Sequence, residues 1–473
     1  MKKITLLALF ILINFFAIGQ TLSGADKQTV NISGSNTAVT LDTFLNFYNP
    51  LITSSGVFVK PVDFTATIPF SISRLKDGFN TSVDDIEVFR DSFKIVTNNI
   101  FYVKKTGSDV ADGLTQQTPF LTVNKAIQAG NTTALAYQIN VGAGFYDYAE
   151  IAFNTVFPTE RLNIVGEDET YLFSGENDLS FIKTSEYTYI YEATVSSSLF
   201  FTVLDKTEKD KFGAFLELPV YSSLAALAVA EKGYYYDGTK LYVQTRYGSY
   251  NADLFMIMYK IQNRIGYSEL STKIYLENVN IYGRQIFEND TIVMRGCDLH
   301  YNSESHLFKS TDAKQVILHS SSFSKSNGGD ILNYTHCDFV AEINCNSDGY
   351  NRNDDVSSQA SSVHDTTEIV RINGVYRGQD QSVTDVTGSK TILLGCNLAS
   401  NYEGNNNTTN TYFTNLQART GAKIWAWDIK LGGGKWDGAA SYELVTDNAA
   451  GSVIYIKETD YIKVLAGSVI TKW

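Results

Sequence analysis

The sequence predicts an all-β fold built as a solenoid, in which the chain winds through stacked coils of similar length. Six segments with one shared pattern recur between residues 275 and 398, and their centres are 18, 24, 24, 29 and 22 residues apart. A repeat of this size is typical of a solenoid. Only 6 of the 473 residues are Pro, which suits strands that pair on both sides and need their N–H groups. Only 19% are charged, which suits coils stacked ~4.8 Å apart, where like charges would repel.

The repeated segments align in columns that predict the shape of one coil. They span residues 275–281, 293–299, 317–323, 341–347, 370–376 and 392–398. The fourth position reads Asn, Gly, Ser, Asn, Asn and Gly, residues that enter the left-handed backbone region at low cost, so we expect a sharp bend there between two strands. The fifth position reads Val, Cys, Ser, Cys, Gly and Cys, which are small enough to fill the inside of that bend. This is the geometry of a parallel β-helix.

The first coil is expected to begin near residue 99. A strand, a Gly/Asp turn and a short helix follow one another as Phe101-Tyr102-Val103, Gly107-Ser108-Asp109, Asp112-Gly113, Thr118-Pro119-Phe120 and Val123 to Ala129, with Gly130 as the stop. This order resembles the entry segment of secreted right-handed parallel β-helix proteins of the pectate-lyase-like superfamily. The resemblance implies a right-handed parallel β-helix over residues 99–425, with the helix capping its open edge. The resemblance is specific for the architecture and does not indicate any particular activity.

Three other regions depart from the repeat. An insert is expected at about residues 170–270, with a helix over Ser222 to Glu231 and a hairpin from Tyr234 to Val243 around a type I′ turn at Asp237-Gly238. Residues 426–473 contain strand-like runs and predict a β-rich C-terminal cap. Residues 20–98 alternate apolar and polar positions and predict a small β-rich N-terminal appendage.

The N-terminus predicts export. Lys2 and Lys3 precede an apolar run from Ile4 to Ile18 that is too short to span a bilayer as a helix. We therefore expect a signal peptide over residues 1–19, cleaved after Gly19. The mature chain is expected to have no integral membrane segment and to be secreted or held at the cell surface.

Charge and cysteine content narrow the partners. The net charge of −13 repels phosphate backbones, so nucleic acid is not expected as a partner. The four cysteines are too few for a disulfide scaffold and are not spaced as zinc ligands. Cys297, Cys345 and Cys396 occupy the fifth position two coils apart, too far to bridge, and are expected to fill the core. Cys337 could pair only if its loop folds back.

The densest polar cluster lies between residues 348 and 385, where the 29-residue step predicts an extra loop. Loops that stand out from a rigid scaffold are where binding and catalysis concentrate. The candidate catalytic residues are Asp348, Asp354, Asp355, His364 and Arg371. The candidate substrate-binding residues are Tyr350, Arg352, Tyr376, Arg377 and Asp380.

Three interpretations of this cluster stay open. In the first, two of its carboxylates act as acid and base or nucleophile in glycoside hydrolysis. In the second, Asp348, Asp354 and Asp355 hold Ca²⁺ while His364 or Arg371 abstracts a proton beside a uronate carboxylate, as in lyases. Calcium is the only cofactor that these residues suggest, and no metal ligand set is assigned.

In the third interpretation, Tyr350, Tyr376 and the arginines only bind sugar, by stacking and hydrogen bonds. Against all three stands the alternative that the loops are solvated turns and that Glu342 pairs with Arg371 across adjacent coils. The paired-aspartate and Gly-His-Gly set of the superfamily's hydrolases is not present in this sequence.

The sequence thus predicts a secreted β-helix protein that binds an extracellular polysaccharide, and cleavage of lyase or hydrolase type stays open. A solenoid presents a long surface whose side chains repeat from coil to coil, which suits an extended polymer. The alternative is a non-catalytic surface adhesin, or a tailspike-like receptor-binding or structural β-helix, which would be trimeric.

Overall fold

The computed structural model describes residues 27–472, except for 33–34, 41–55, 77, 152–155, 178, 211–212, 246–249, 252, 261, 264–271, 304, 328, 349–358, 379–380, 401–411, 433–439, 448–449 and 462–463. Contacts divide the chain into two units, one of residues 1–59 and 71–81 and one of residues 60–70 and 82–473. Among the described residues, no helix has the length and apolar character needed to cross a membrane.

The smaller unit contains two antiparallel hairpins. The first joins β1 (Lys27–Ile32) to β2 (Ser35–Thr40), and the second joins β3 (Ile72–Leu75) to β4 (Gly78–Thr81). The β-rich appendage over residues 20–98 stays a prediction. In the structure, residues 60–70 and 82–98 belong to the larger unit.

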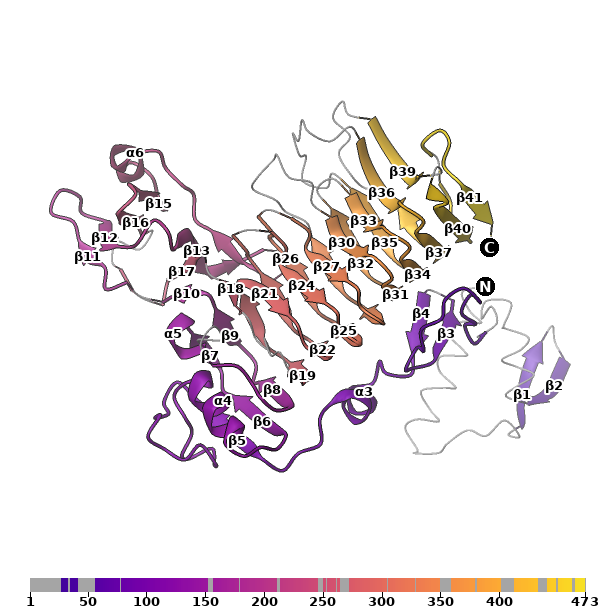
Figure 1. The fold of residues 1–473 in the computed structure, drawn as a ribbon, viewed down its shortest axis with the longest axis horizontal. Helices are drawn as coiled ribbons and strands as arrows, with labels where there is room; N and C mark the ends of the chain where they lie inside the picture. Colours follow the sequence, from indigo (N-terminus) through magenta and orange to yellow (C-terminus); the bar gives the residue numbers. More distant parts are fainter. Residues whose placement is uncertain are drawn as a thin grey trace. The chain divides into compact units, whose positions relative to one another are not determined.

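The larger unit is built on three parallel sheets, to which the chain returns in turn (Figure 1). Sheet 1 comprises β5 (Ile100–Val103), β6 (Tyr137–Val141), β8 (Leu162–Gly166), β19 (Lys273–Glu277), β22 (Thr291–Arg295), β25 (Gln315–His319), β28 (Val340–Ile343), β31 (Glu368–Ile372), β34 (Lys390–Leu394), β37 (Lys423–Trp427), β40 (Val453–Lys457) and β41 (Ile470–Lys472). Sheet 2 comprises β7 (Gly144–Tyr146), β9 (Thr170–Phe173), β20 (Asn280–Tyr282), β23 (Asp298–His300), β26 (Ser322–Ser324), β29 (Asn346–Asp348), β32 (Val375–Gly378), β35 (Asn397–Ser400) and β38 (Lys430–Leu431). Sheet 3 comprises β18 (Gln262–Asn263), β21 (Arg284–Phe287), β24 (Phe308–Thr311), β27 (Leu332–Thr335), β30 (Gln359–His364), β33 (Gln381–Asp385), β36 (Tyr412–Ala418) and β39 (Ala440–Thr446).

The predicted parallel β-helix is confirmed, and so is its register. The first position of the six aligned segments forms one continuous ladder across sheet 1, from Tyr275 to Ile392. The fourth position adopts positive φ throughout, between +48° at Ser320 and +64° at Gly395. The residue at the bend between sheets 1 and 2 therefore has a left-handed backbone conformation in each of these coils. Asp428 and Glu458 continue the same bend in the last coils, at φ of +52° and +47°.

The fifth position fills the core as expected. Cys297, Cys345 and Cys396 are fully buried, and all four cysteines of the chain are free. Cys337 is also buried and lies against the backbone carbonyl of Ser310. The cysteines are therefore core residues of the solenoid.

The first end of the solenoid is covered by α4 (Val123–Asn131), whose apolar face buries Val123, Ala126 and Ile127. Thr122 is its N-cap and accepts a hydrogen bond from the backbone N–H of Lys125. At the other end β37 to β41 extend the solenoid, and Trp425 stacks on Tyr455 with ring centroids 5.4 Å apart. A short helix, α5 (Tyr148–Ile151), follows β7.

The insert folds into two antiparallel four-stranded sheets beside the first coils (Figure 1). They contain β10 (Gly175–Glu176), β11 (Ile182–Lys183), β12 (Ile190–Thr194), β13 (Phe200–Lys209), β14 (Phe215–Glu217), β15 (Gly233–Tyr236), β16 (Lys240–Gln244) and β17 (Phe255–Tyr259). The predicted helix is present as α6 (Leu224–Ala228), with Ser223 as its N-cap, and the hairpin joins β15 to β16. Its turn is one residue later than predicted, because Asp237 pairs with Lys240 and only Gly238, at φ +101°, is left-handed.

A feature that the sequence analysis missed is an N-terminal arm, defined here as residues 60–70 and 82–98, with helix α3 (Ile86–Phe93). The arm crosses the outward side of sheet 1. Phe89 packs on Tyr275 of β19 and on His319 of β25, at ring-centroid distances of 6.4 and 5.0 Å. Further along, Thr65 and the backbone N–H of Ala66 each donate to Glu368 at 2.6 Å.

Ion pairs hold the arm at both ends. Arg90 pairs with the buried carboxylate of Glu277, and Lys423 pairs with Asp63 at 2.7 Å. Burial alone would raise the pKa of Glu277, but hydrogen bonds from Arg90 and Tyr275 hold it below its usual range. The arm therefore takes the outward side of sheet 1 away from solvent.

Candidate functional site

The structure separates the residues that the sequence analysis grouped into one site. Tyr350, Arg352, Asp354, Asp355 and Asp380 lie outside the described residues, so their assigned roles stay predictions. The other five are distributed over all three sheets and the interior. Asp348 ends β29, His364 ends β30, Arg371 lies in β31, and Tyr376 and Arg377 lie in β32.

Arg371 points into the solenoid. Its side chain is fully buried, and it follows Glu342 in the inward column of sheet 1 that begins with Leu276, Met294 and Leu318. The guanidinium donates to Ser361 Oγ at 2.9 and 3.0 Å and to both carboxylate oxygens of Asp385 at 3.3 and 3.4 Å.

Glu342 completes this internal network. Its Oε2 lies 3.6 Å from Arg371 Nε, and its Oε1 accepts a hydrogen bond from Ser361 at 2.9 Å. The pairing of Glu342 with Arg371 across adjacent coils, considered above as the alternative to catalysis, is therefore what the structure contains. Burial raises the pKa of Asp385, and the charge of Arg371 offsets this only in part.

The predicted roles of Arg371 in catalysis and of Tyr376 in stacking on sugar need correction. Both side chains are fully buried, so neither can touch a polymer that lies outside the coil. The physical reason is that successive side chains of a β-strand point to opposite faces of the sheet. Arg371 and Tyr376 occupy the positions that face the interior of the solenoid. Tyr376 is the neighbour in register of Ser347 and Leu398 in the inward column of sheet 2.

Asp348 and Arg377 do come together. They are partners in register on β29 and β32, on the outward side of sheet 2. His364 lies on β30 of sheet 3, next to Thr335, and so belongs to a different face. Among the described residues, no group of three or more His, Cys, Asp or Glu could hold a metal ion, and the proposed Ca²⁺ site over Asp348, Asp354 and Asp355 stays a prediction.

The outward side of sheet 2 carries a regular polar column. Side chains one position before the buried column follow one another in register, and they are Asn280, Asp298, Ser322, Asn346, Val375, Asn397 and Lys430. Asn346 and Lys430 are exposed and the others are half-buried. We call this set the polar column; apart from Val375, its side chains present amide, carboxyl, hydroxyl and ammonium groups, one from each coil.

Two hollows lie at the ends of this column. The first has a volume of about 430 Å³, lies between sheet 2 and the insert, and is lined by Phe145, Glu169, Tyr171, Lys206, Lys209 and Phe215. Tyr171 is the neighbour in register of both Phe145 and Asn280, so the aromatic pair begins the column. The second hollow, about 280 Å³, is lined by Arg377, Asn397, Leu398 and Lys430 among others.

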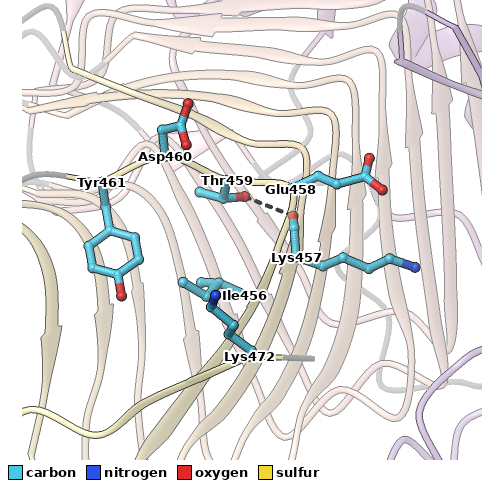
Figure 2. A pocket seen from close by; sticks show the side chains of 7 residues that line it. All are labelled: Ile456, Lys457, Glu458, Thr459, Asp460, Tyr461 and Lys472. Carbon is cyan, nitrogen blue, oxygen red and sulfur yellow. Dashed lines mark hydrogen bonds between the residues drawn. The ribbon is translucent and has the colours of Figure 1, made fainter.

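A third cavity, of about 710 Å³, lies beside β40 and β41 in the last coil (Figure 2). It is lined by Ile456, Lys457, Glu458, Thr459, Asp460, Tyr461 and Lys472. Figure 2 shows these side chains diverging, with the ends of Lys457 and Glu458 on one side and Tyr461 on the other. Because binding sites are marked by polar groups that converge, this cavity is a weaker candidate than the polar column.

Comparisons with known proteins give likenesses of fold only. No protein-family model matches the sequence, and no curated protein is similar to it. One similar solved structure is a glycoside hydrolase, with 11% identity and a TM-score of 0.45 over 79% of this chain and 96% of that chain. Another is XylC in complex with xylose, with 9% identity and a TM-score of 0.43 over 76% and 70% of the two chains. A third is the tailspike protein gp49 of Pseudomonas phage LKA1, with 11% identity and a TM-score of 0.20 over 74% and 76%.

Proposed function

We propose that this chain is an exported β-helix protein that binds an extracellular polysaccharide along the polar column of sheet 2. The observation that carries this proposal is the contrast between two outward faces. On sheet 1 the outward ladder from Tyr275 to Ile392 is apolar and covered by the chain's own arm. On sheet 2 the corresponding ladder is polar and reaches solvent.

The dimensions of the column suit an extended polymer. From Asn280 to Lys430 it takes six steps from strand to strand, or about 29 Å at ~4.8 Å per step. A chain of hydroxyl-rich rings laid along it would meet a hydrogen-bonding side chain at every coil except that of Val375. Export is supported by the signal-like segment over residues 1–19, and the entry segment supports placing the chain with the secreted pectate-lyase-like β-helix proteins.

Binding without cleavage is the form of this proposal that the internal network favours. Arg371, one of the two candidates for proton abstraction together with His364, is engaged by Glu342, Ser361 and Asp385 inside the coil. In the described part of the candidate cluster, Arg377 is the side chain on sheet 2 that reaches solvent, because Asp348 beside it is only 3% exposed. Arg371 is enclosed in the coil and cannot act on a polymer outside it. A stiff, non-catalytic surface adhesin is compatible with the same surface.

The test is binding of the purified mature protein, beginning at Gln20, to a panel of neutral and acidic polysaccharides with and without Ca²⁺. Unsaturated products and new reducing ends are followed in the same samples, so that a lyase or a hydrolase would be seen. Asn346→Trp places a bulky ring in the middle of the polar column, and Thr311→Trp on sheet 3 is the matched control, with folding of both checked by thermal melting.

We expect Asn346→Trp to weaken binding at least about tenfold and Thr311→Trp to leave it unchanged. Failure of the mature protein to bind any polysaccharide would overturn the proposal. So would equal affinities of the two tryptophan variants.

A further inference from the structure

The hollow at the first end of the polar column has a different chemistry from the column itself. Its floor is aromatic. Phe145 and Tyr171 stack with centroids 4.6 Å apart and planes within 9° of parallel, and Phe215 lies 5.2 Å from Tyr171. The insert is held against this floor by polar contacts, since Tyr282 accepts from the backbone N–H of Phe215 and Tyr301 donates to its carbonyl. These hydrogen bonds fix Phe215 of the insert against the solenoid, so the floor is part of the larger unit's packed structure.

Two ammonium groups lie over this floor. Lys206 Nζ is 4.4 Å from the centre of the Phe145 ring, and Lys209 Nζ is 5.2 Å from Tyr171 and 5.1 Å from Phe215. Lys209 Nζ also donates to the hydroxyl of Tyr171 at 2.8 Å. Such contacts with ring faces position a cation without neutralising its charge.

The charge balance of the hollow is positive on a strongly acidic chain. The lining contributes two lysines and one carboxylate, Glu169, whereas the whole chain carries −13. Within the described part of the chain, Lys209 has no carboxylate within ion-pair distance, and its partners are a phenol and two rings. Burial lowers the pKa of Lys206 to about 8, although Asp253 acts in the opposite direction. Lys206 Nζ also donates to Asn177 Oδ1 at 3.0 Å. An anion in the hollow would place a negative charge close to both ammonium groups.

We infer that this hollow is a subsite for a sugar ring that carries a negative substituent, held by Lys206 and Lys209 above the rings of Phe145, Tyr171 and Phe215. The inference rests on the proposed function, because the hollow continues the polar column in register through Tyr171 and Asn280. It names the substrate class as an anionic polysaccharide and places one end of the bound polymer at the insert. The arrangement at the far end agrees, since Arg377 and Lys430 line the second hollow.

The experiment compares three tetrasaccharides that share one backbone. They are cellotetraose, its C6-carboxylated form and its 6-sulfated form, each titrated calorimetrically into the full mature protein. We expect both charged forms to bind more tightly than the neutral form, with an affinity that falls as salt is added. The two charged arms distinguish a carboxylate from a sulfate as the natural substituent.

Three variants locate the effect. Lys209→Gln removes one charge from the hollow and is expected to weaken binding of the charged tetrasaccharides about tenfold, the usual scale for a hydrogen bond to a charged group. Lys183→Gln removes one charge from an exposed position on β11 of the same insert and should leave affinity unchanged. Glu169→Gln removes the opposing carboxylate and should strengthen binding.

Equal affinities for the charged and neutral tetrasaccharides, or equal effects of Lys209→Gln and Lys183→Gln, would overturn the inference. If Asn346→Trp still weakens polymer binding in that case, the proposed function survives and only the charge preference is wrong. Loss of all saccharide binding by the unmodified protein would overturn both.

Discussion

Replacement of Arg371 by methionine tests whether the internal network is structural. Methionine has nearly the length of arginine and no charge, so it fills the inward column between Glu342 and Leu393 while removing every hydrogen bond that the guanidinium donates. Two carboxyl groups, Glu342 and Asp385, then remain fully buried without a cation. Removing one partner of a buried ion pair costs about 3–5 kcal/mol, because the remaining charge is uncompensated.

The cost should depend on pH with a definite sign. Burial already raises the pKa of Asp385, so its folded form holds a proton more tightly than its unfolded form does. A raised carboxyl pKa contributes stability at acid pH that is lost as pH rises through the folded value. Without Arg371 that pKa should rise further. The free-energy deficit of the variant is therefore expected to be largest near pH 7 and to shrink toward about pH 4.

Denaturant unfolding of both proteins, followed by tryptophan fluorescence at the two pH values, measures this deficit. Arg419→Met is the control, because Arg419 is exposed, and a surface change of this kind costs within about 0.5 kcal/mol. A compensated variant, in which Glu342 and Arg371 become Leu and Asp385 becomes Ala, should regain most of the lost stability. A deficit no larger than that of Arg419→Met, or one that does not change with pH, would refute the structural assignment.

Three further outcomes follow from single positions. Asn344 sits in the left-handed bend at φ +54°, so Asn344→Val should lower the free energy of unfolding by about 1–2 kcal/mol while Asn344→Gly leaves it nearly unchanged, as measured by thermal melting. Glu277→Gln removes the charged partner of Arg90 and should lower the free energy of unfolding by about 1.5–3 kcal/mol. It should also speed proteolysis within the arm, and an unchanged cleavage rate would show that the ion pair does not hold the arm. Because the pKa of Lys206 is lowered to about 8, affinity for the carboxylated tetrasaccharide should fall as pH rises through that value, and a flat calorimetric profile would exclude the lysine.

The register of the solenoid could be predicted because it depends on local backbone chemistry. Asn278, Gly296 and Asn344 are residue types that accept positive φ, and each marks a bend that the structure contains. Asp428 and Glu458 adopt the same bend in the last coils. Asp is a residue type that tolerates positive φ and Glu is not, so the residue type gives no signal at Glu458. At Glu458 the parallel pairing of β40 with β37 keeps the chain in register with the preceding coil.

The candidate site could not be predicted in the same way, because the period of two carries no information when both faces of a strand are buried. Tyr275 and Leu276 are both apolar, one beneath the arm and the other in the core. Without a polar outward column, nothing in the strand sequence reveals which positions face inward. The sequence analysis therefore placed Arg371 in a surface site, although it belongs to the inward column that begins with Leu276.

The apolar outward positions of sheet 1 do, however, predict that something covers this sheet. An outward column that reads Tyr, Val, Ile, Ala, Val and Ile over six coils has to be covered by something, since monomeric proteins rarely expose apolar patches of that size. The cover is the chain's own N-terminal arm, through Phe89 and α3. Once sheet 1 is occupied in this way, a polymer that runs along the coils has to use another face. The polar column of sheet 2 offers hydrogen-bonding groups without a break in register from Asn280 to Asn346. The arm therefore excludes the outward side of sheet 1 as a recognition surface, although it contributes no residue to the surface that we propose binds the saccharide.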